Sequence, residues 1–357
     1  MTDIDVAVNI LGGDTNKVIY DEIGLPSIMV EISEENFTFD GVTYGADIHH
    51  PAFIVNGTHR PKFYVSKYQN AVMHGRGYSM PMQVPHRNSN FDFAFNACKS
   101  KGFGWHLMTN AEWAYLAILG YLPHGNNNGG TDFRGEDRYG TRAELADRSL
   151  SDLILTGSGP VSFSHNGKAS GIWDLNGNVP EWVNGLRLNA PEINIYPNND
   201  AADFTNVESW RAILSTGELV PPGTTGSLKL GSSSSPIIIT NSDYPTLAED
   251  KTEQLFSSLS SYETDIPHIM KALAIAPWDG VEEGYISMKN IGIRPALRGG
   301  GSTDGIKAGI RALNFCHLAD VSGFAFRSSY IDLLDSVLLA DEDGTALATE
   351  NGMIVTN

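Results

Sequence analysis

The segment from Ile293 to Arg327, IRPALRGGGSTDGIKAGIRALNFCHLADVSGFAFR, decides the fold and the function that we predict for this chain. Framework-like glycine and apolar positions recur in it: Arg298-Gly299-Gly300 near its start, Ala312-Leu313-Asn314 in its middle and Gly323–Arg327 at its end. The side chains between them follow neither the period of a strand nor that of a helix. The segment therefore predicts a fixed frame that presents an arbitrary set of side chains, which favours recognition over catalysis.

Outside this segment, the first third of the chain is predicted to form short strands and two helices. The strands are expected at Val6–Leu11, Ser27–Ile32, Phe37–Tyr44 (a hairpin whose turn contains Asp40-Gly41), Ala52–Val55 and Phe63–Gln69. The helices are expected at Phe91–Lys99 and Leu107–Gly120. The second helix begins with a capping box formed by Thr109 and Glu112.

The rest of the chain alternates polar stretches with short predicted elements. Its expected features are a surface loop at Pro123–Tyr139, a strand, turn and strand at Gly171–Val183 with Trp173 and Trp182 in the core, a Pro/Ser-rich polar surface insertion at 186–248, helices at Glu249–Tyr262 and Pro267–Ile275, and a small acidic β-meander in Ser328–Asn357.

Composition limits the classes of partner. The 357-residue chain has a formal net charge of −18 and no cluster of Lys and Arg, which excludes nucleic acids and anionic membranes because phosphates require basic patches. No apolar run is long enough to cross a membrane, so we expect no membrane insertion. The N-terminal MTDIDVAVNILGG carries acids where a signal peptide needs positive charge. We therefore expect a protein that, if it acts outside the cell, leaves by another route, such as inside a virion.

Three motifs resemble those of one protein superfamily. They are KGFGWHLMTNAEWAYLA at 101–117, GIWDLNGNVPEW at 171–182, and the ending RPALRGGGS…GFAFR within 294–327. In this order, over roughly residues 62–328, they resemble the helix start, the Gly-Asn-Val-x-Glu-Trp element and the closing Arg-Gly-Gly-Ser…Gly-Phe-Arg of the formylglycine-generating-enzyme superfamily. The resemblance implies an α+β chain with a C-type-lectin-like fold of the formylglycine-generating-enzyme type.

On this resemblance we predict the following organisation. An N-terminal β segment occupies residues 1–50, and the lectin-like domain occupies 51–329, with its surface insertion at about 186–248 and a variable region at about 298–327. A short acidic β extension follows at 330–357.

The resemblance also implies a structural calcium site. In relatives, the Asn-Gly-Asn-x-x-Glu loop can hold a calcium ion, and Asn176 and Glu181 match its side-chain ligands. Such oxygen ligands suit calcium chemically. The alternative, which we favour, is a turn in which Glu181 accepts hydrogen bonds from backbone amides. No other cofactor is expected.

The enzymatic chemistry of the superfamily is not expected here. Its oxidases use two reactive cysteines close together near the C-terminus, whereas this chain has Cys316 there and Cys98 on a predicted helix. These spacings match neither a CxxC pair nor a zinc site, and we expect free thiols, although a disulfide between them stays open. The His-x-x-x-His-x-Glu iron site of related sulfoxide synthases is absent. The scattered loop histidines are expected to be solvated bystanders: His49, His50, His59 and His86.

The C-terminal region more closely resembles the variable proteins of diversity-generating retroelements, which share this fold. MKALAIAP at 270–277, Leu297–Gly300 and Ala308–Asn314 match that family in order, although Ser302 stands where Trp is common. In the family, adenine-directed mutagenesis rewrites mainly asparagine codons. The resemblance implies that the following residues, called the exchange positions below, form a variable ligand-binding surface: Ser302, Thr303, Asp304, Ile306, Arg311, Asn314, Cys316, His317, Leu318, Asp320, Val321, Ser322 and Phe324.

The leading hypothesis is thus a hypervariable ligand-binding protein, most plausibly a phage or viral receptor-binding protein on the virion surface. Its expected partner is a host-cell surface protein or glycan, and a homo-oligomer would raise weak single-site binding through avidity. Two rivals stay open: a cysteine-dependent oxidase of the formylglycine-generating type and a calcium-dependent carbohydrate lectin. The apolar exchange positions could also be core residues of a C-terminal strand pair rather than an exposed patch.

Overall fold

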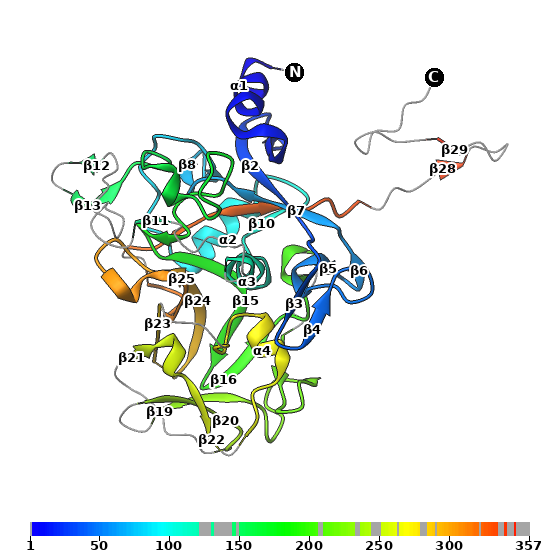
Figure 1. Ribbon diagram of the computed structural model, residues 1–357, viewed down its shortest axis with the longest axis vertical. Helices are drawn as coiled ribbons and strands as arrows, with labels where there is room; N and C mark the ends of the chain where they lie inside the picture. Colours follow the sequence, from blue (N-terminus) through cyan, green and yellow to red (C-terminus); the bar gives the residue numbers. More distant parts are fainter. Residues whose placement is uncertain are drawn as a thin grey trace.

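The chain folds mainly into β-sheet with few helices (Figure 1). The computed structural model describes residues 2–120, 130–131, 145–147, 150–205, 210–232, 236–243, 251–262, 264–278, 284–289, 291–320, 323–334, 339–340 and 346–347. The α-helices in these ranges are α1 (Asp3–Gly12), α2 (Phe91–Lys99), α3 (Asn110–Leu119) and α4 (His268–Ala272). This mixed architecture is compatible with the predicted α+β class. No helix in the described ranges is long and apolar enough to cross a membrane.

A five-stranded sheet joins the two ends of the fold. Its strands, in spatial order, are β1 (Asn16–Tyr20), β2 (Pro26–Ser33), β7 (Lys62–Ser66), β27 (Ser328–Tyr330) and β10 (Trp105–Leu107). Strand β27 follows directly after Arg327, the end of the predicted variable region, and it pairs antiparallel with both β7 and β10. The end of the segment 298–327 is therefore fixed between strands from the first third of the chain.

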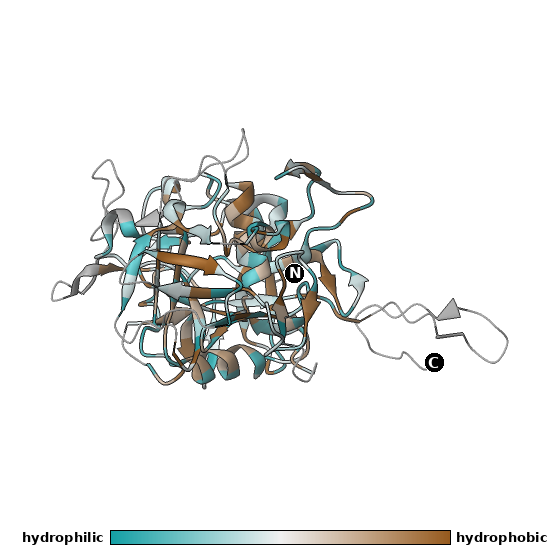
Figure 2. Ribbon diagram, turned by 90° about the horizontal axis from the view of Figure 1, so that it is seen from below, coloured by the Kyte–Doolittle hydropathy of each residue, from teal (hydrophilic) through white to brown (hydrophobic). Residues whose placement is uncertain are grey.

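A larger sheet carries much of the segment 298–327 that was predicted to be variable. Its main path runs through β21 (Thr252–Leu255), β23 (Tyr285–Met288), β25 (Gly309–Phe315), β24 (Ile293–Gly299), β15 (Glu181–Asn189), β16 (Glu192–Ile195), β19 (Lys229–Ser232), β20 (Ile237–Thr240) and β22 (Ser260–Tyr262). Three further strands branch from it: β17 (Arg211–Ile213), β18 (Leu219–Val220) and β26 (Ala325–Phe326). Hydrophobic residues are spread over the strands and helices of the body of the fold (Figure 2), and many of the buried ones form the main hydrophobic core.

The remaining elements are short. They comprise the strand pairs β3 (Phe37–Phe39) with β4 (Val42–Tyr44), β5 (Ile54–Val55) with β6 (Thr58–His59), β8 (Ala71–Met73) with β9 (Arg76–Tyr78), β11 (Gly130–Thr131) with β14 (Asn176–Gly177), β12 (Leu145–Asp147) with β13 (Leu150–Ile154), and β28 (Leu339–Ala340) with β29 (Ala346–Leu347). The 3-10 turns are η1 (Gly13–Thr15), η2 (Pro51–Phe53), η3 (Val161–Phe163), η4 (Asp200–Ala202), η5 (Phe256–Ser258) and η6 (Gly305–Lys307).

Elements with strong local signals form as predicted. Helix α2 has the predicted bounds, and α3 begins with the capping box in which Thr109 and Glu112 satisfy each other's backbone amides. The hairpin β3–β4 turns at Asp40 and Gly41, whose φ angles of 48° and 80° lie in the left-handed region that such turns need. Most of the predicted loop Pro123–Tyr139, and all of the tail beyond residue 334 except β28 and β29, lie outside the described residues.

Two predicted elements are wrong. The segment Val6–Leu11, predicted as a strand, lies within α1, where a capping box between Thr2 and Asp5 starts the helix. The apolar run from Val6 to Leu11 fits a short strand as well as a helix. The capping box decides in favour of the helix, in which Ile10 is 76% exposed. The segment Glu249–Tyr262, predicted as a helix, contains the strands β21 and β22. Pairing of β21 with β23 overrides the local helical pattern.

The segment 186–248 was predicted to be a polar surface insertion, but the described part of it belongs to the larger sheet. It supplies β16 to β20 and the last four residues of β15. The side chains of Ile193, Ile195, Leu230, Ile237 and Ile239 are buried in the main hydrophobic core. These residues alternate along their strands, a signal that the polar loops between the strands conceal in the overall composition.

Candidate ligand-binding face

A buried arginine fixes the start of the segment 298–327, the predicted variable region. The Arg298 guanidinium donates from Nε and Nη2 to the side-chain oxygen of Asn110 at 3.0 and 2.6 Å, and from Nη2 to the carbonyl of Ala274 at 3.0 Å. Strand β24 is thereby fastened to the start of α3 and to the end of α4. Burial lowers the pKa of Arg298 to about 9, because loss of solvent disfavours the charged form.

A second buried arginine fixes its end. Arg327 forms a two-pronged ion pair with Glu181, in which Nε donates to Oε2 and Nη2 to Oε1, each at 2.7 Å. Its Nη1 donates to the carbonyl of Ser66 at 3.0 Å, and its Nη2 also donates to the carbonyl of Trp173 at 2.9 Å. Arg327 therefore joins the end of the segment 298–327 to β15, to β7 and to the turn before β14.

This ion pair changes the interpretation of Glu181. Both of its oxygens accept hydrogen bonds from Arg327, and Oε1 also accepts one from Gln69 at 2.9 Å, so the carboxylate bonds a guanidinium rather than the expected backbone amides. Asn176 is buried, and its Oδ1 has no hydrogen-bond partner among the residues that the structure describes. The arrangement gives Glu181 a structural role that leaves it little capacity to hold calcium.

The Arg-Gly-Gly turn after β24 requires its glycines. Gly300 has a φ of 73°, and a Cβ on it would lie 2.6 Å from the Cα of Ala308. Gly299 has a φ of 87°, and a Cβ there would lie 2.9 Å from the carbonyl oxygen of Leu175. Both positions combine a left-handed backbone with close approach of another segment, and only glycine meets both conditions without strain.

The exchange positions occupy two connections and one strand. The first connection runs from Gly300 to Ala308, between β24 and β25, and the second from Cys316 to Phe324, between β25 and β26. The exposed positions are Thr303, Asp304, His317 and Asp320. The half-buried positions are Asn314, Cys316, Leu318 and Phe324.

Two exchange positions point inward. Ser302 is 6% exposed, and Arg311 is 1% exposed, with its guanidinium carbon 5.8 Å from the centre of the Trp278 ring. These two side chains do not contribute to an exposed surface. The side chain of Ile306, in η6, and the residues Val321 and Ser322 lie outside the described part of the chain.

The half-buried apolar positions partly cover the core, as one of the sequence interpretations allowed. The Phe324 ring packs edge-on against Trp182 with 5.2 Å between ring centres. Cys316 and Phe324 both pack against the buried cluster that contains Cys98, Leu297 and Trp182. These positions therefore contribute to stability as well as to the surface.

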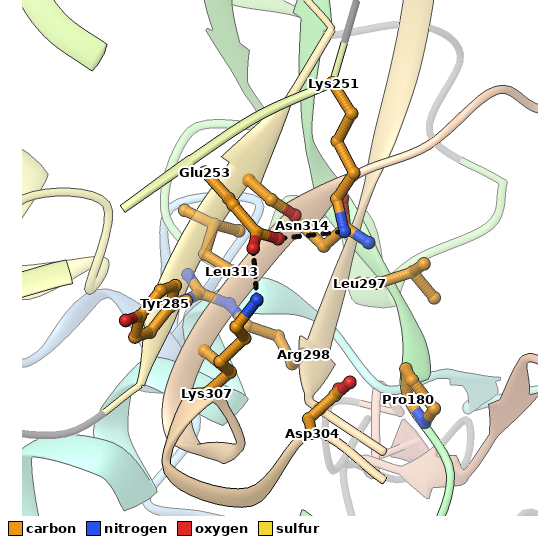
Figure 3. A pocket seen from close by; sticks show the side chains of 13 residues that line it. Pro180, Lys251, Glu253, Tyr285, Leu297, Arg298, Asp304, Lys307, Leu313 and Asn314 are labelled. Carbon is orange, nitrogen blue, oxygen red and sulfur yellow. Dashed lines mark hydrogen bonds and ion pairs between the residues drawn. The ribbon is translucent and has the colours of Figure 1, made fainter. Parts of the chain in front are cut away.

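Two adjoining cavities open beside the exposed exchange positions. The first has a volume of about 60 Å³ and is lined by residues of the strands β21, β23, β24 and β25 and by Asp304 (Figure 3). The second has a volume of about 220 Å³ and is lined by Arg87, Asn178, Thr303 and their neighbours. Pro180 and Asp304 line both cavities. Together these cavities and the exposed exchange positions form the candidate ligand-binding face, called the ligand-binding face below.

Charged side chains line part of the first cavity. Glu253 pairs with Lys307 and, at 3.2 Å, with Lys251, and the Lys307 ammonium lies 5.3 Å from the centre of the Tyr285 ring (Figure 3). The hydrogen bond from Lys307 lowers the pKa of the Glu253 carboxyl. The sequence interpretation missed Lys251, Glu253 and Tyr285 because it placed a helix where β21 forms, and a strand at that position was needed to bring them together.

The two cysteines lie in an environment that keeps them protonated. Both are free thiols. Cys98 is fully buried, and burial raises its pKa well above the usual range. Burial also raises the pKa of Cys316 to about 11. Because the thiolate is the nucleophilic and metal-binding form, neither side chain is activated at neutral pH.

Comparisons with known proteins assign no family. No family model and no curated protein matches the chain. Among solved structures, the chain is similar to one described as the structure of PvdO from Pseudomonas aeruginosa, with 14% sequence identity and a TM-score of 0.37 over 89% of this chain and 99% of that chain. This similarity is too distant to assign an activity.

Proposed function

We propose that this chain is a hypervariable ligand-binding protein of the kind diversified by retroelements, with a C-type-lectin-like fold of the formylglycine-generating-enzyme type. It would act on the surface of a phage or virus particle and recognise a host-cell surface protein or glycan. The proposal assigns the exposed exchange positions and the two cavities beside them to ligand contact.

The observation that supports this proposal best is that buried framework residues and exposed residues lie in separate positions along Ile293–Arg327. The charged framework residues Arg298 and Arg327 are buried and hydrogen-bonded to distant elements. By contrast, Thr303 and Asp304 in one connection and His317 and Asp320 in the other are exposed. Substitutions at such exposed sites usually change stability by less than about 0.5 kcal/mol, so the face can vary while the frame persists.

The two rival functions find less support. A cysteine-dependent oxidase needs accessible, activated thiols, whereas burial raises the pKa of both Cys98 and Cys316. A calcium-dependent lectin of the type expected from the Asn-Gly-Asn-x-x-Glu loop needs Glu181 as a ligand, whereas Arg327 takes both of its oxygens. Loss of an oxidase activity on replacing the cysteines, or calcium-gated glycan affinity, would favour these rivals instead.

The diversification can be tested in the genome that encodes the chain. We expect a near-copy of the DNA for Arg298–Arg327 that differs at adenines and lies beside a reverse transcriptase gene. A locus with neither feature would remove the diversification from the proposal.

The binding role can be tested separately by display. A library diversified at the four exposed exchange positions should yield folded binders when it is selected against an unrelated panel of cell-surface proteins and glycans. The matched control is a library diversified at four exposed residues outside the face: Thr43, Asp47, Thr216 and Glu218. Equal yields of binders from the two libraries would refute a specialised ligand-binding face.

A further inference from the structure

Three side chains converge in the first part of the fold, and two of them, His49 and His59, are histidines that the sequence predicted to be solvated bystanders. Glu34 follows β2, His49 precedes η2, and His59 ends β6. His49 Nδ1 and His59 Nε2 each lie 2.8 Å from the same atom, Glu34 Oε2. The two imidazole rings are stacked, with 3.5 Å between their centres and 11° between their planes. Within the described ranges, this is the one group of three such side chains with the mutual spacing of metal ligands.

The backbone around this cluster is fixed by hydrogen bonds to neighbouring segments. The second oxygen of Glu34, Oε1, accepts the backbone amide of His50 at 3.0 Å, which leaves Oε2 directed at the two imidazoles. The amide of Glu34 donates to the carbonyl of Pro61 at 3.1 Å. The Tyr115 hydroxyl accepts from the amide of Glu35 at 2.8 Å and donates to the carbonyl of Ser33 at 3.1 Å. The carboxylate is thus held before any ligand arrives.

The burial of the three side chains suits a site that opens to solvent on one side. The Glu34 side chain is 8% exposed, whereas those of His49 and His59 are 24% and 37% exposed. An ion could therefore reach the cluster from the histidine side. The cluster also spans a predicted boundary, since Glu34 and His49 precede residue 51 and His59 follows it.

We propose that Glu34, His49 and His59 form a binding site for one divalent transition-metal ion such as Zn²⁺. Two imidazoles and one carboxylate are ligands that zinc and its neighbours prefer, whereas calcium and magnesium prefer oxygen ligands alone. Three protein ligands leave a fourth position for water. The ion would fasten the segment after β2 to the β5–β6 hairpin.

The geometry requires the histidines to rearrange on binding, because the two stacked rings must tilt apart before both in-plane lone pairs can point at one ion. Neighbouring ligand atoms around tetrahedral zinc lie roughly 3.3 Å apart, given zinc–ligand bonds of about 2.0–2.1 Å. The two nitrogens at 2.8 Å from Glu34 Oε2 must therefore move outward by about half an ångström. Rotation of the partly exposed histidine side chains supplies this movement without displacing the buried carboxylate.

The test uses the full chain, freed of metal with EDTA and titrated calorimetrically with Zn²⁺ alone. We expect one ion to bind per chain, and the unfolding midpoint to rise by a few degrees at a hundredfold excess over the dissociation constant. His49→Gln and His59→Gln should each weaken binding by at least about tenfold, since even the loss of outer-shell partners has effects of this size. Ca²⁺ and Mg²⁺ should not produce the shift.

The control variant is His74→Asn, which changes an exposed histidine in the β8–β9 turn to a residue that tolerates its positive φ of 52°. It should bind Zn²⁺ as the wild type does. Circular dichroism of the metal-free histidine variants should match that of the wild type, which separates loss of a ligand from loss of the fold. Absence of stoichiometric binding, or equal affinities in His59→Gln and His74→Asn, would overturn the proposal. The result is independent of the ligand-binding face, which shares no residue with this cluster.

Discussion

Removal of the Arg327 guanidinium should destabilise the protein severely. Replacement by methionine keeps an unbranched side chain of similar length but deletes the charge and every hydrogen-bond donor. Four hydrogen bonds of 3.0 Å or less are lost: two to Glu181 and one each to the carbonyls of Ser66 and Trp173. The Glu181 side chain, which is 1% exposed, is then left with Gln69 as its remaining donor.

The magnitude follows from that uncompensated charge. Breaking a buried ion pair by removing one partner costs about 3–5 kcal/mol. Replacing both partners by uncharged side chains of similar volume is often close to neutral. The double variant Glu181→Gln with Arg327→Met should therefore be more stable than Arg327→Met alone, although the two carbonyls stay unsatisfied.

The assay is urea unfolding followed by circular dichroism and tryptophan fluorescence for the wild type, the two single variants and the double variant. The double-mutant cycle isolates the pairwise free energy, which we expect to exceed about 1.5 kcal/mol. A loss below about 1 kcal/mol in Arg327→Met, or a coupling free energy near zero, would refute the assigned role of this pair.

Three further predictions concern single positions. Gly300→Ala should lower the free energy of unfolding by about 2–5 kcal/mol, because its Cβ would meet the Ala308 Cα at 2.6 Å. The control Gly292→Ala, at a similar φ of 70° but with open space around the new Cβ, should lower it by only about 1 kcal/mol. Similar losses of unfolding free energy in the two variants, measured by urea unfolding, would contradict the clash. Burial raises the pKa of Asp174 to about 7, above its value in the unfolded chain, so the neutral form contributes stability at low pH that is lost as the pH rises from about 4 through 7. Urea unfolding across this pH range should show that the free energy of unfolding declines by about 1–4 kcal/mol in the wild type and stays nearly constant in Asp174→Asn. The same pH dependence in both proteins would count against the raised pKa of Asp174. With a pKa of about 11, Cys316 should react with a disulfide reagent at pH 8 at least about 100-fold more slowly in the native than in the unfolded protein, and rapid native labelling would revive the oxidase hypothesis.

The sequence predicted those parts of the fold whose signals are local. The capping box of Thr109 and Glu112 and the Asp40-Gly41 turn depend on residues a few positions apart, and both form as expected. Where a distant strand decides the outcome, prediction failed. Thr252–Leu255 becomes a strand because β23 offers a partner, and no local pattern reports that partner.

The sequence likewise predicted some parts of the candidate site and missed others. The exposed loops around Asp304 and His317 were expected from the irregular pattern between framework residues, and the structure places them at the surface. The burial of Arg311 and the contribution of Glu253 depend on how separate strands align, which spacing along the chain does not encode.

The charged residues inside two apolar motifs indicate an ion pair that the sequence analysis did not predict. Glu181 stands in Asn-Val-Pro-Glu-Trp and Arg327 in Phe-Ala-Phe-Arg, and each is the one charged residue in its stretch. A charge that is buried with its neighbours needs a partner of opposite sign, so the two motifs could have been paired on physical grounds. The sequence around His49 and His59 gives no comparable indication that they meet Glu34, because both histidines lie in polar loops.

The most direct test of the account is a saturation scan of Ile293–Arg327 in which a display library is sorted for folded protein. We predict wide tolerance at Thr303, Asp304, His317 and Asp320, and intolerance at Arg298, Gly299, Gly300 and Arg327. Tolerance that is the same in both groups, or greater in the second, would contradict a rigid frame that carries an exchangeable surface.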